Sequence, residues 1–197
     1  MKELTFPDIK VSSGRAVIVP SAKTQRNTFS GTTTVFDNGT DFWRERVQLP
    51  FTKGDEAFAL DNLLTELRGP VNGVWLKDWN YKARGDWDGT LVVDGANQEG
   101  TQLALRGGAV SKTIAKVGDR FQLGKRAHQL TADATTDGSG DVVVSFEPQL
   151  KVIPTDGQAI ITDNPMTLYR WMNSDSRPQF DKYRRVLRGI DLLFEEA

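Results

Sequence analysis

The only histidine of the chain, His128, is the first residue to weigh for chemistry. An imidazole titrates near neutrality and can act as a general base, but catalysis also needs a nucleophile or a metal, and a carboxylate that orients the ring. Ser111, Ser139 and Ser145 are available, yet none stands in a nucleophile motif such as Gly-x-Ser-x-Gly. The pattern predicts a structural His128 on a β-hairpin, and we expect its change to alanine to alter stability little.

Metal and phosphate sites have weak support in the sequence. The chain has no cysteine and a single histidine, whereas zinc and transition metals usually take several such ligands. The acidic and glycine residues at 137–141 follow a calcium-like order but lack the glutamate that closes an EF-hand loop. Among the 26 acids, no carboxylate pair stands in a recognisable glycosidase frame. We expect no enzymatic activity, no metal and no cofactor.

Charge is nearly balanced, with 25 Lys and Arg residues against 26 Asp and Glu residues. A protein that grips duplex DNA usually carries an excess of cations. The local basic strip at 182–185, with Arg188, is interpreted as a solvated or interfacial strand face, so we expect at most weak, salt-sensitive DNA binding. No apolar run of about 18 residues is present, which predicts no membrane partner.

The N-terminal third predicts a sheet with one buried face. Residues 14–20 suit a short strand, and residues 32–50 predict a hairpin that turns at Asn38-Gly39. Along the return strand, apolar and polar side chains alternate between two faces: Trp43, Val47 and Leu49 against Arg44, Arg46 and Gln48.

The period changes after this hairpin. Leu60, Leu63, Leu64 and Leu67 are spaced as one stripe of a helix that Asp55 can cap and that Gly69-Pro70 ends. The stripe is too narrow for a helix bundle and suits packing on a sheet. We expect this to be the only substantial helix.

From residue 88 short apolar bursts alternate with glycine-rich turn clusters, a texture typical of five or six strands in a small barrel or sandwich. Longer, aromatic-rich strands return near the C-terminus. The sequence therefore predicts a mainly β chain of two domains. Residues 1–85 and 162–197 would form a discontinuous β-sandwich with one α-helix, and residues 86–161 an inserted β-barrel. We expect each domain to fold without the other.

Part of the chain resembles tail proteins of long-tailed bacteriophages. Residues 54–69 and 74–105 are similar to distal tail proteins of the T5-like type, and the likeness covers roughly residues 50–160. The segment that follows resembles the domain inserted in such proteins at a set of matching positions: Gly118, Asp119, Phe121, Leu123, His128, Thr131, Gly138, Gly140, Pro148 and Leu150.

This resemblance implies a structural protein of the virion, made in the bacterial host cytoplasm. In distal tail proteins the sandwich domains close into a homohexameric ring at the distal end of the tail tube. The ring joins the tail tube protein to the baseplate hub or fibre protein, and DNA passes through it as cargo. In the T5-like type an inserted OB-fold domain projects from the outside of the ring.

A closed ring needs a heterologous interface, made by two different faces of each subunit. The candidates for that interface are an exposed aromatic and the arginine-rich strands: Trp43, Arg44, Arg46, Arg184, Arg185 and Arg188. The alternative function is an OB-like binding module, or a minor tail protein, that recognises a host-surface oligosaccharide. Trp79, Trp87 and Phe121 would then stack the ligand, whereas the many acids of 86–161 argue against nucleic acid.

Overall fold

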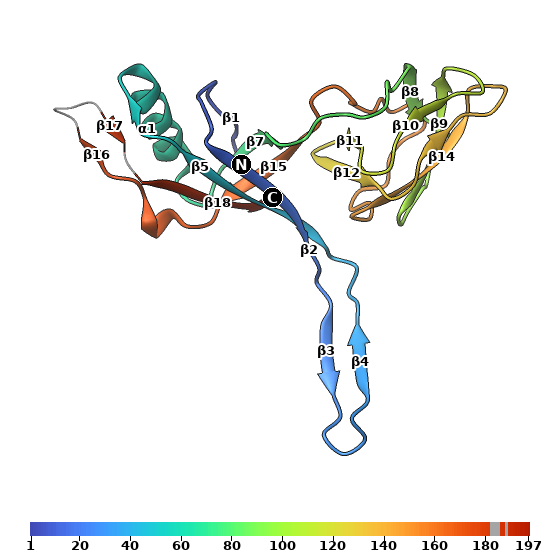
Figure 1. The fold of residues 1–197 in the computed structure, drawn as a ribbon, viewed down its shortest axis with the longest axis horizontal. Helices are drawn as coiled ribbons and strands as arrows, with labels where there is room; N and C mark the ends of the chain where they lie inside the picture. The colour runs from blue at the N-terminus through green and yellow to red at the C-terminus, as the bar shows by residue number, and fades with distance from the viewer. Residues whose placement is uncertain (182–185, 188) are drawn as a thin grey trace.

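Two hydrophobic cores and one projecting ribbon make up the structure, a computed structural model that describes residues 1–181, 186–187 and 189–197 (Figure 1). The described chain is mainly β with one α-helix, arranged as a sandwich and a smaller barrel-like region, which confirms the predicted fold class. Residues of the first core lie between 9 and 76 and between 169 and 194, and those of the second between 87 and 146.

The first core is built on a six-stranded sheet whose strand order is β1-β7-β15-β18-β5-β2. Only β1 and β7 run parallel, and the other neighbours are antiparallel. The two edge strands are therefore β1 and β2. The six strands have the following bounds: β1 (Glu3–Thr5), β2 (Ser13–Val19), β5 (Phe42–Leu49), β7 (Gly73–Lys77), β15 (Met166–Trp171) and β18 (Ile190–Glu196).

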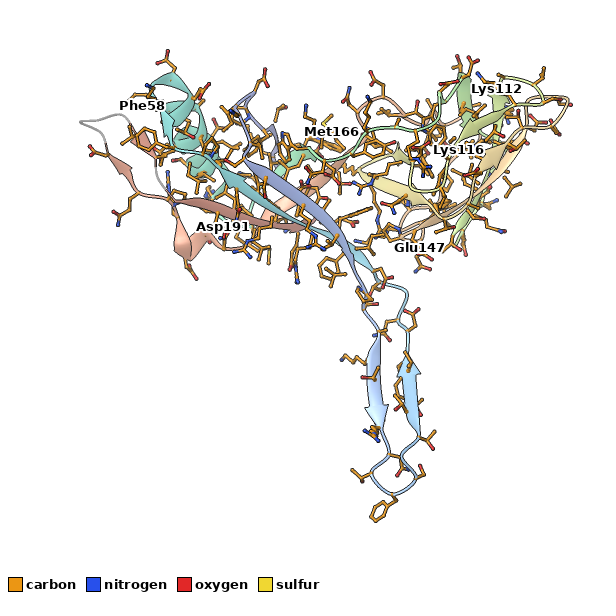
Figure 2. All side chains as sticks on the ribbon, in the orientation of Figure 1. Phe58, Lys112, Lys116, Glu147, Met166 and Asp191 are labelled. Atoms are coloured by element: carbon orange, nitrogen blue, oxygen red, sulfur yellow. The ribbon has the colours of Figure 1, made fainter. Side chains whose placement is uncertain are left out.

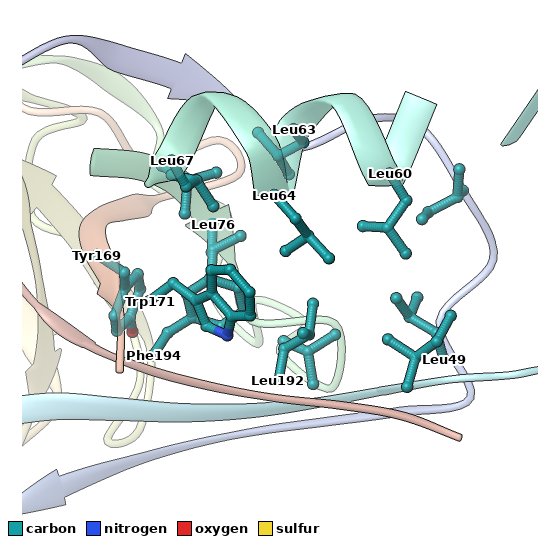
Figure 3. Packing of buried hydrophobic residues seen from close by; sticks show 14 of the residues in the cluster. Leu49, Leu60, Leu63, Leu64, Leu67, Leu76, Tyr169, Trp171, Leu192 and Phe194 are labelled. Atoms are coloured by element: carbon teal, nitrogen blue, oxygen red, sulfur yellow. The ribbon is translucent and has the colours of Figure 1, made fainter. Parts of the chain in front are cut away.

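Helix α1 (Asp55–Leu67) covers one face of this sheet with the predicted leucine stripe (Figure 3). The leucines pack against Leu49, Leu192 and Trp171 from three strands. Asp55 is the first helical residue and does not cap the helix: Gly54 precedes it, with no side-chain cap bond. A short 3-10 helix, η1 (Ser174–Ser176), and a three-stranded sheet complete this body: β6 (Thr52–Lys53), β16 (Phe180–Asp181) and β17 (Val186–Leu187).

The second core lies inside a five-stranded sheet ordered β11-β12-β14-β9-β8. Backbone bridges join Val92 of β8 to Ala159 and Gln122 of β11 to Ile161. Because β8 and β11 are the opposite edges, the segment 159–161 closes the sheet into a small barrel. The strands of this region are β8 (Gly89–Val93), β9 (Gln102–Gly108), β11 (Arg120–Leu123), β12 (Arg126–Leu130) and β14 (Val142–Glu147), with a short ladder of β10 (Thr113–Ala115) and β13 (Ala134–Thr135).

The predicted hairpin turn at Asn38-Gly39 is wrong. Strand β4 (Thr33–Phe36) pairs with β3 (Lys23–Arg26), whereas β5 pairs with β2. The Asp37 carboxylate accepts the Gly39 N–H at 2.9 Å and only bends the chain between β4 and β5. The reversal comes earlier, where the Asn27 side chain accepts the Phe29 N–H at 2.9 Å and the Asn27 N–H donates to the Thr32 carbonyl at 2.8 Å.

The two bodies are joined by buried polar and aromatic contacts. The Trp43 indole donates to the Ala127 carbonyl at 2.7 Å, and the Arg120 guanidinium lies over the same indole, 4.6 Å from its ring centre. Arg120 also pairs with Asp78 at 2.7 Å. The barrel is therefore seated on the sheet by specific contacts as well as by its two chain connections.

Candidate interaction surfaces

The ribbon formed by β3, β4 and the turn between them, residues 23–36, projects from the body and is hereafter called the arm (Figure 1). Every arm residue is exposed, and the side chains project into solvent on both sides (Figure 2). Phe29 at the turn is 99% exposed, and Val35 and Phe36 are exposed as well. A two-stranded ribbon without a core is marginally stable alone in water. Contact with another molecule would therefore stabilise the arm.

Arg44 and Arg46 lie on the outer face of the six-stranded sheet, where each pairs with a carboxylate of β18. Arg44 Nε donates to Glu195 at 2.9 Å, and Arg46 Nε donates to Asp191 at 2.8 Å. The Arg46 guanidinium lowers the pKa of Asp191 below its usual value. An exposed ion pair contributes only about 0–1 kcal/mol. Both arginines are accessible on this face, but their charges are already matched within the chain.

Trp43 does not belong with these two arginines on the surface. Its side chain is 2% exposed and lies between the sheet and the barrel, where Ala127 and Arg120 hold it. Alternation along β5 placed it correctly on the apolar face, and that face is covered by this chain itself. The candidate interface is therefore corrected to exclude Trp43. Arg184, Arg185 and Arg188 lie outside the described residues.

The edge strand β2 offers a second surface for assembly. Among the described strands it pairs only with β5, so one side of its backbone is open to another strand, although the Gly14 carbonyl already accepts the Asn80 side-chain amide. A groove of about 550 Å³ lies on the outer face of the sheet across β2, β5 and β18, lined by Arg15, Arg44, Arg46 and Leu193 among others. An open edge can accept a strand from another chain.

His128 is buried in the barrel core and borders the cavity described below. Its ring stacks on Phe121 at 5.3 Å and meets Phe146 edge-on at 4.8 Å, while Nδ1 donates to the Pro148 carbonyl at 2.7 Å. Desolvation, and to a lesser extent the positive charge of Arg126, lower the pKa of His128 to about 3. The neutral ring acts as a core aromatic. The expectation that alanine would change little is therefore corrected, because alanine would leave a cavity there.

Glu45 is a buried acid that sequence reasoning missed. It stands on the inward face of β5 between Trp43 and Val47, and neither carboxylate oxygen has a well-formed hydrogen bond in the described structure. Burial and then the negative charge of Asp78 raise the pKa of Glu45 to about 8, against smaller opposing effects of Tyr169 and Arg120. The alternation of inward and outward side chains along β5 could have revealed that Glu45 points inward.

A cavity of about 380 Å³ opens where the barrel meets the end of β18. Its apolar walls come from Leu123 of β11 and from Leu150, Val152 and Pro154, which follow β14. Val152 at this cavity is 77% exposed. The size suits a small ligand or a single large side chain. No sequence motif marked this cavity, because its walls come together only in the tertiary structure.

The three aromatics considered for ligand stacking do not share an exposed surface. Trp87 and Phe121 are buried in the barrel core, and Trp79 packs edge-on against Phe6 in the other body. In the described chain no group of three or more His, Asp or Glu side chains is arranged to hold a metal ion. No described helix has the length and apolarity needed to cross a bilayer.

No known protein family matches the chain, and comparison with curated proteins finds no match either.

Proposed function

We propose that the chain is a structural subunit that assembles into a homohexameric ring at the distal end of a phage tail tube. The ring would join the tail tube protein to the baseplate hub or fibre protein, with DNA as passing cargo and the virion as its location. This role needs no catalysis. The resemblance of residues 50–160 to distal tail proteins supports the phage assignment and supplies the number six.

The observation that carries the assembly is the arm. Its apolar side chains join neither core, with Phe29 99% and Phe36 51% exposed, and the arm points away from both bodies (Figure 1). Large exposed apolar groups on a protruding element mark an interaction site. The surface that covers the arm must then belong to another molecule.

A ring follows if that molecule is a second copy. The arm and the surface that receives it are different parts of the chain, so each contact is heterologous and leaves one free arm and one free receiving surface. Such contacts close into a ring when the rotation between neighbours divides a full turn. The open edge of β2 beside the arm offers a further contact of the same kind.

The test is the mass of the purified full chain in solution. Light scattering and native mass spectrometry should report about six times 21.9 kDa at micromolar concentration, and electron microscopy should show rings. A chain that stays monomeric at high micromolar concentration would overturn the proposal. A dimer with two-fold symmetry would also overturn it, because an isologous contact does not build a six-membered ring.

A further inference from the structure

We propose that Phe29 at the arm tip of one copy inserts into the 380 Å³ cavity of a neighbouring copy. This inference rests on the proposed self-assembly and names the contact that would hold it together. The arm supplies an aromatic knob, and the junction between barrel and sheet supplies the hole.

The turn at the end of the arm holds the backbone of Phe29 in a defined conformation. Asn27 accepts the N–H groups of Phe29 and Ser30, at 2.9 and 3.2 Å, which orders the backbone that carries the ring. The four register pairs between β3 and β4 hold this turn away from the body. An aromatic side chain on a turn whose backbone is already ordered suits a binding anchor, since less backbone entropy remains to be lost.

The cavity has apolar walls and exposed apolar residues at its rim. Leu123, Leu150 and Pro154 line it, and Val152 and Ile153 beside it are exposed to solvent. Burial of a Phe side chain removes a large apolar surface from water, which favours binding. A neighbour's Phe29 would fill the cavity while the rest of the turn covers the exposed Val152.

Electrostatics do not oppose this contact. Residues 27–32 of the turn carry no charge. At the cavity, Lys151 pairs with Glu196 at 2.8 Å, and Lys125 pairs with Glu3 at 2.5 Å. Arg126 lies 3.1 Å from the same Glu196 carboxylate. An uncharged turn thus meets a wall whose cations already have carboxylate partners, so neither side leaves a new unpaired charge.

The contact must form between copies. The arm extends away from the barrel in the described structure, so a chain cannot fill its own cavity without unfolding the arm from its base (Figure 1). Knob and hole on different parts of one chain produce a head-to-tail arrangement, which is what a closed ring requires.

The chain has no cysteine, so a single engineered pair reports on this contact directly. Full-length protein with both Phe29→Cys and Val152→Cys should form disulfide-linked ladders between copies under mild oxidation. The matched control combines Phe29→Cys with Val110→Cys, an exposed apolar barrel residue that does not line the cavity, and should give no ladder. Ladders with the control pair alone would overturn the inference.

A mixing experiment tests the same contact without cross-linking. Phe29→Ala removes the knob, and Val152→Trp obstructs the mouth of the hole; both positions are exposed, so folding should be unchanged by circular dichroism. Each variant alone should assemble at least tenfold more weakly than the natural chain. An equal mixture should form one-to-one dimers and nothing longer, because each copy keeps only one half of the contact.

The outcomes separate the two proposals. Oligomers that form without the cross-link and resist both substitutions overturn this inference and leave the ring standing. A natural chain that remains monomeric overturns both. If Phe29→Ala assembles normally but no longer binds a nucleic acid or a different protein, the arm serves another partner. That result would also overturn the inference.

Discussion

His128 shows how a residue that suggests chemistry can serve packing. Its ring fills space between Phe121 and Phe146 with less than a tenth of its surface exposed. We predict that His128→Ala destabilises the chain by about 2–4 kcal/mol, the usual range for truncation of a large buried side chain. Urea unfolding measures the loss. Gln102→Ala, at an exposed position of β9, is the control and should stay within about 0.5 kcal/mol. Equal stability of both variants would contradict the described core.

Glu45 predicts a dependence of stability on pH. Its pKa is about 8 in the folded chain and 4.5 as a free group, so the folded state holds a proton that the unfolded state releases between these values. The stabilisation that comes from this proton is therefore fully present below pH 4.5. It is lost as the pH rises towards 8, by about 1.4 kcal/mol per pH unit. Glu45→Gln should remove this loss. Asp78, Arg120 and Tyr169 remain in both proteins.

The measurement is urea unfolding of both proteins at intervals from pH 5 to pH 8. Their difference in stability should widen steadily with pH. His128 acts in the opposite sense: its lowered pKa gives stability that is present above pH 6.5 and lost as the pH falls towards 3. Parallel curves for the natural chain and Glu45→Gln would show that Glu45 is not a buried neutral acid.

At the scale of elements, the arm should be dispensable for folding. None of its side chains contributes to either core. We predict that replacing residues 23–36 with a short Gly-Ser turn leaves the thermal midpoint within a few degrees and abolishes assembly. Calorimetry and light scattering check the two effects separately. A truncated chain that unfolds would mean that the arm supports the body it projects from.

The helix was predictable and the arm was not, for a physical reason. Leu60, Leu63, Leu64 and Leu67 give a local period that only one structure satisfies. Asn38-Gly39 is an equally strong local signal for a turn, but the tertiary structure uses it for a bend and reverses the chain at Asn27. The same contrast holds for the candidate surfaces. Alternation along β5 correctly predicted that Arg44 and Arg46 share the outer face, whereas the cavity is lined by segments that no local sequence pattern connects.

At the scale of the whole molecule, the contacts between barrel and sheet revise the expectation of two independent domains. Removal of residues 86–161 would expose Trp43 and would leave Asp78 and Glu196 without Arg120 and Arg126. Exposure of the apolar surface that the barrel covers costs free energy. We predict that a chain with this region replaced by a Gly-Ser linker loses most of its stability and shows red-shifted tryptophan fluorescence. Residues 86–161 alone should fold, because their core is nearly self-contained.

The placement of β18 has a consequence for synthesis on the ribosome. This strand hydrogen-bonds to both β15 and β5, yet it follows β5 by about 140 residues. At translation rates of roughly 5–20 residues per second, β5 waits on the order of ten seconds for its partner. The barrel strands lie between them and can close in that interval. A nascent chain would therefore carry a finished barrel while the ribbon that leads to the arm is still unpaired along one edge, and this ribbon is the segment exposed longest to neighbouring nascent chains.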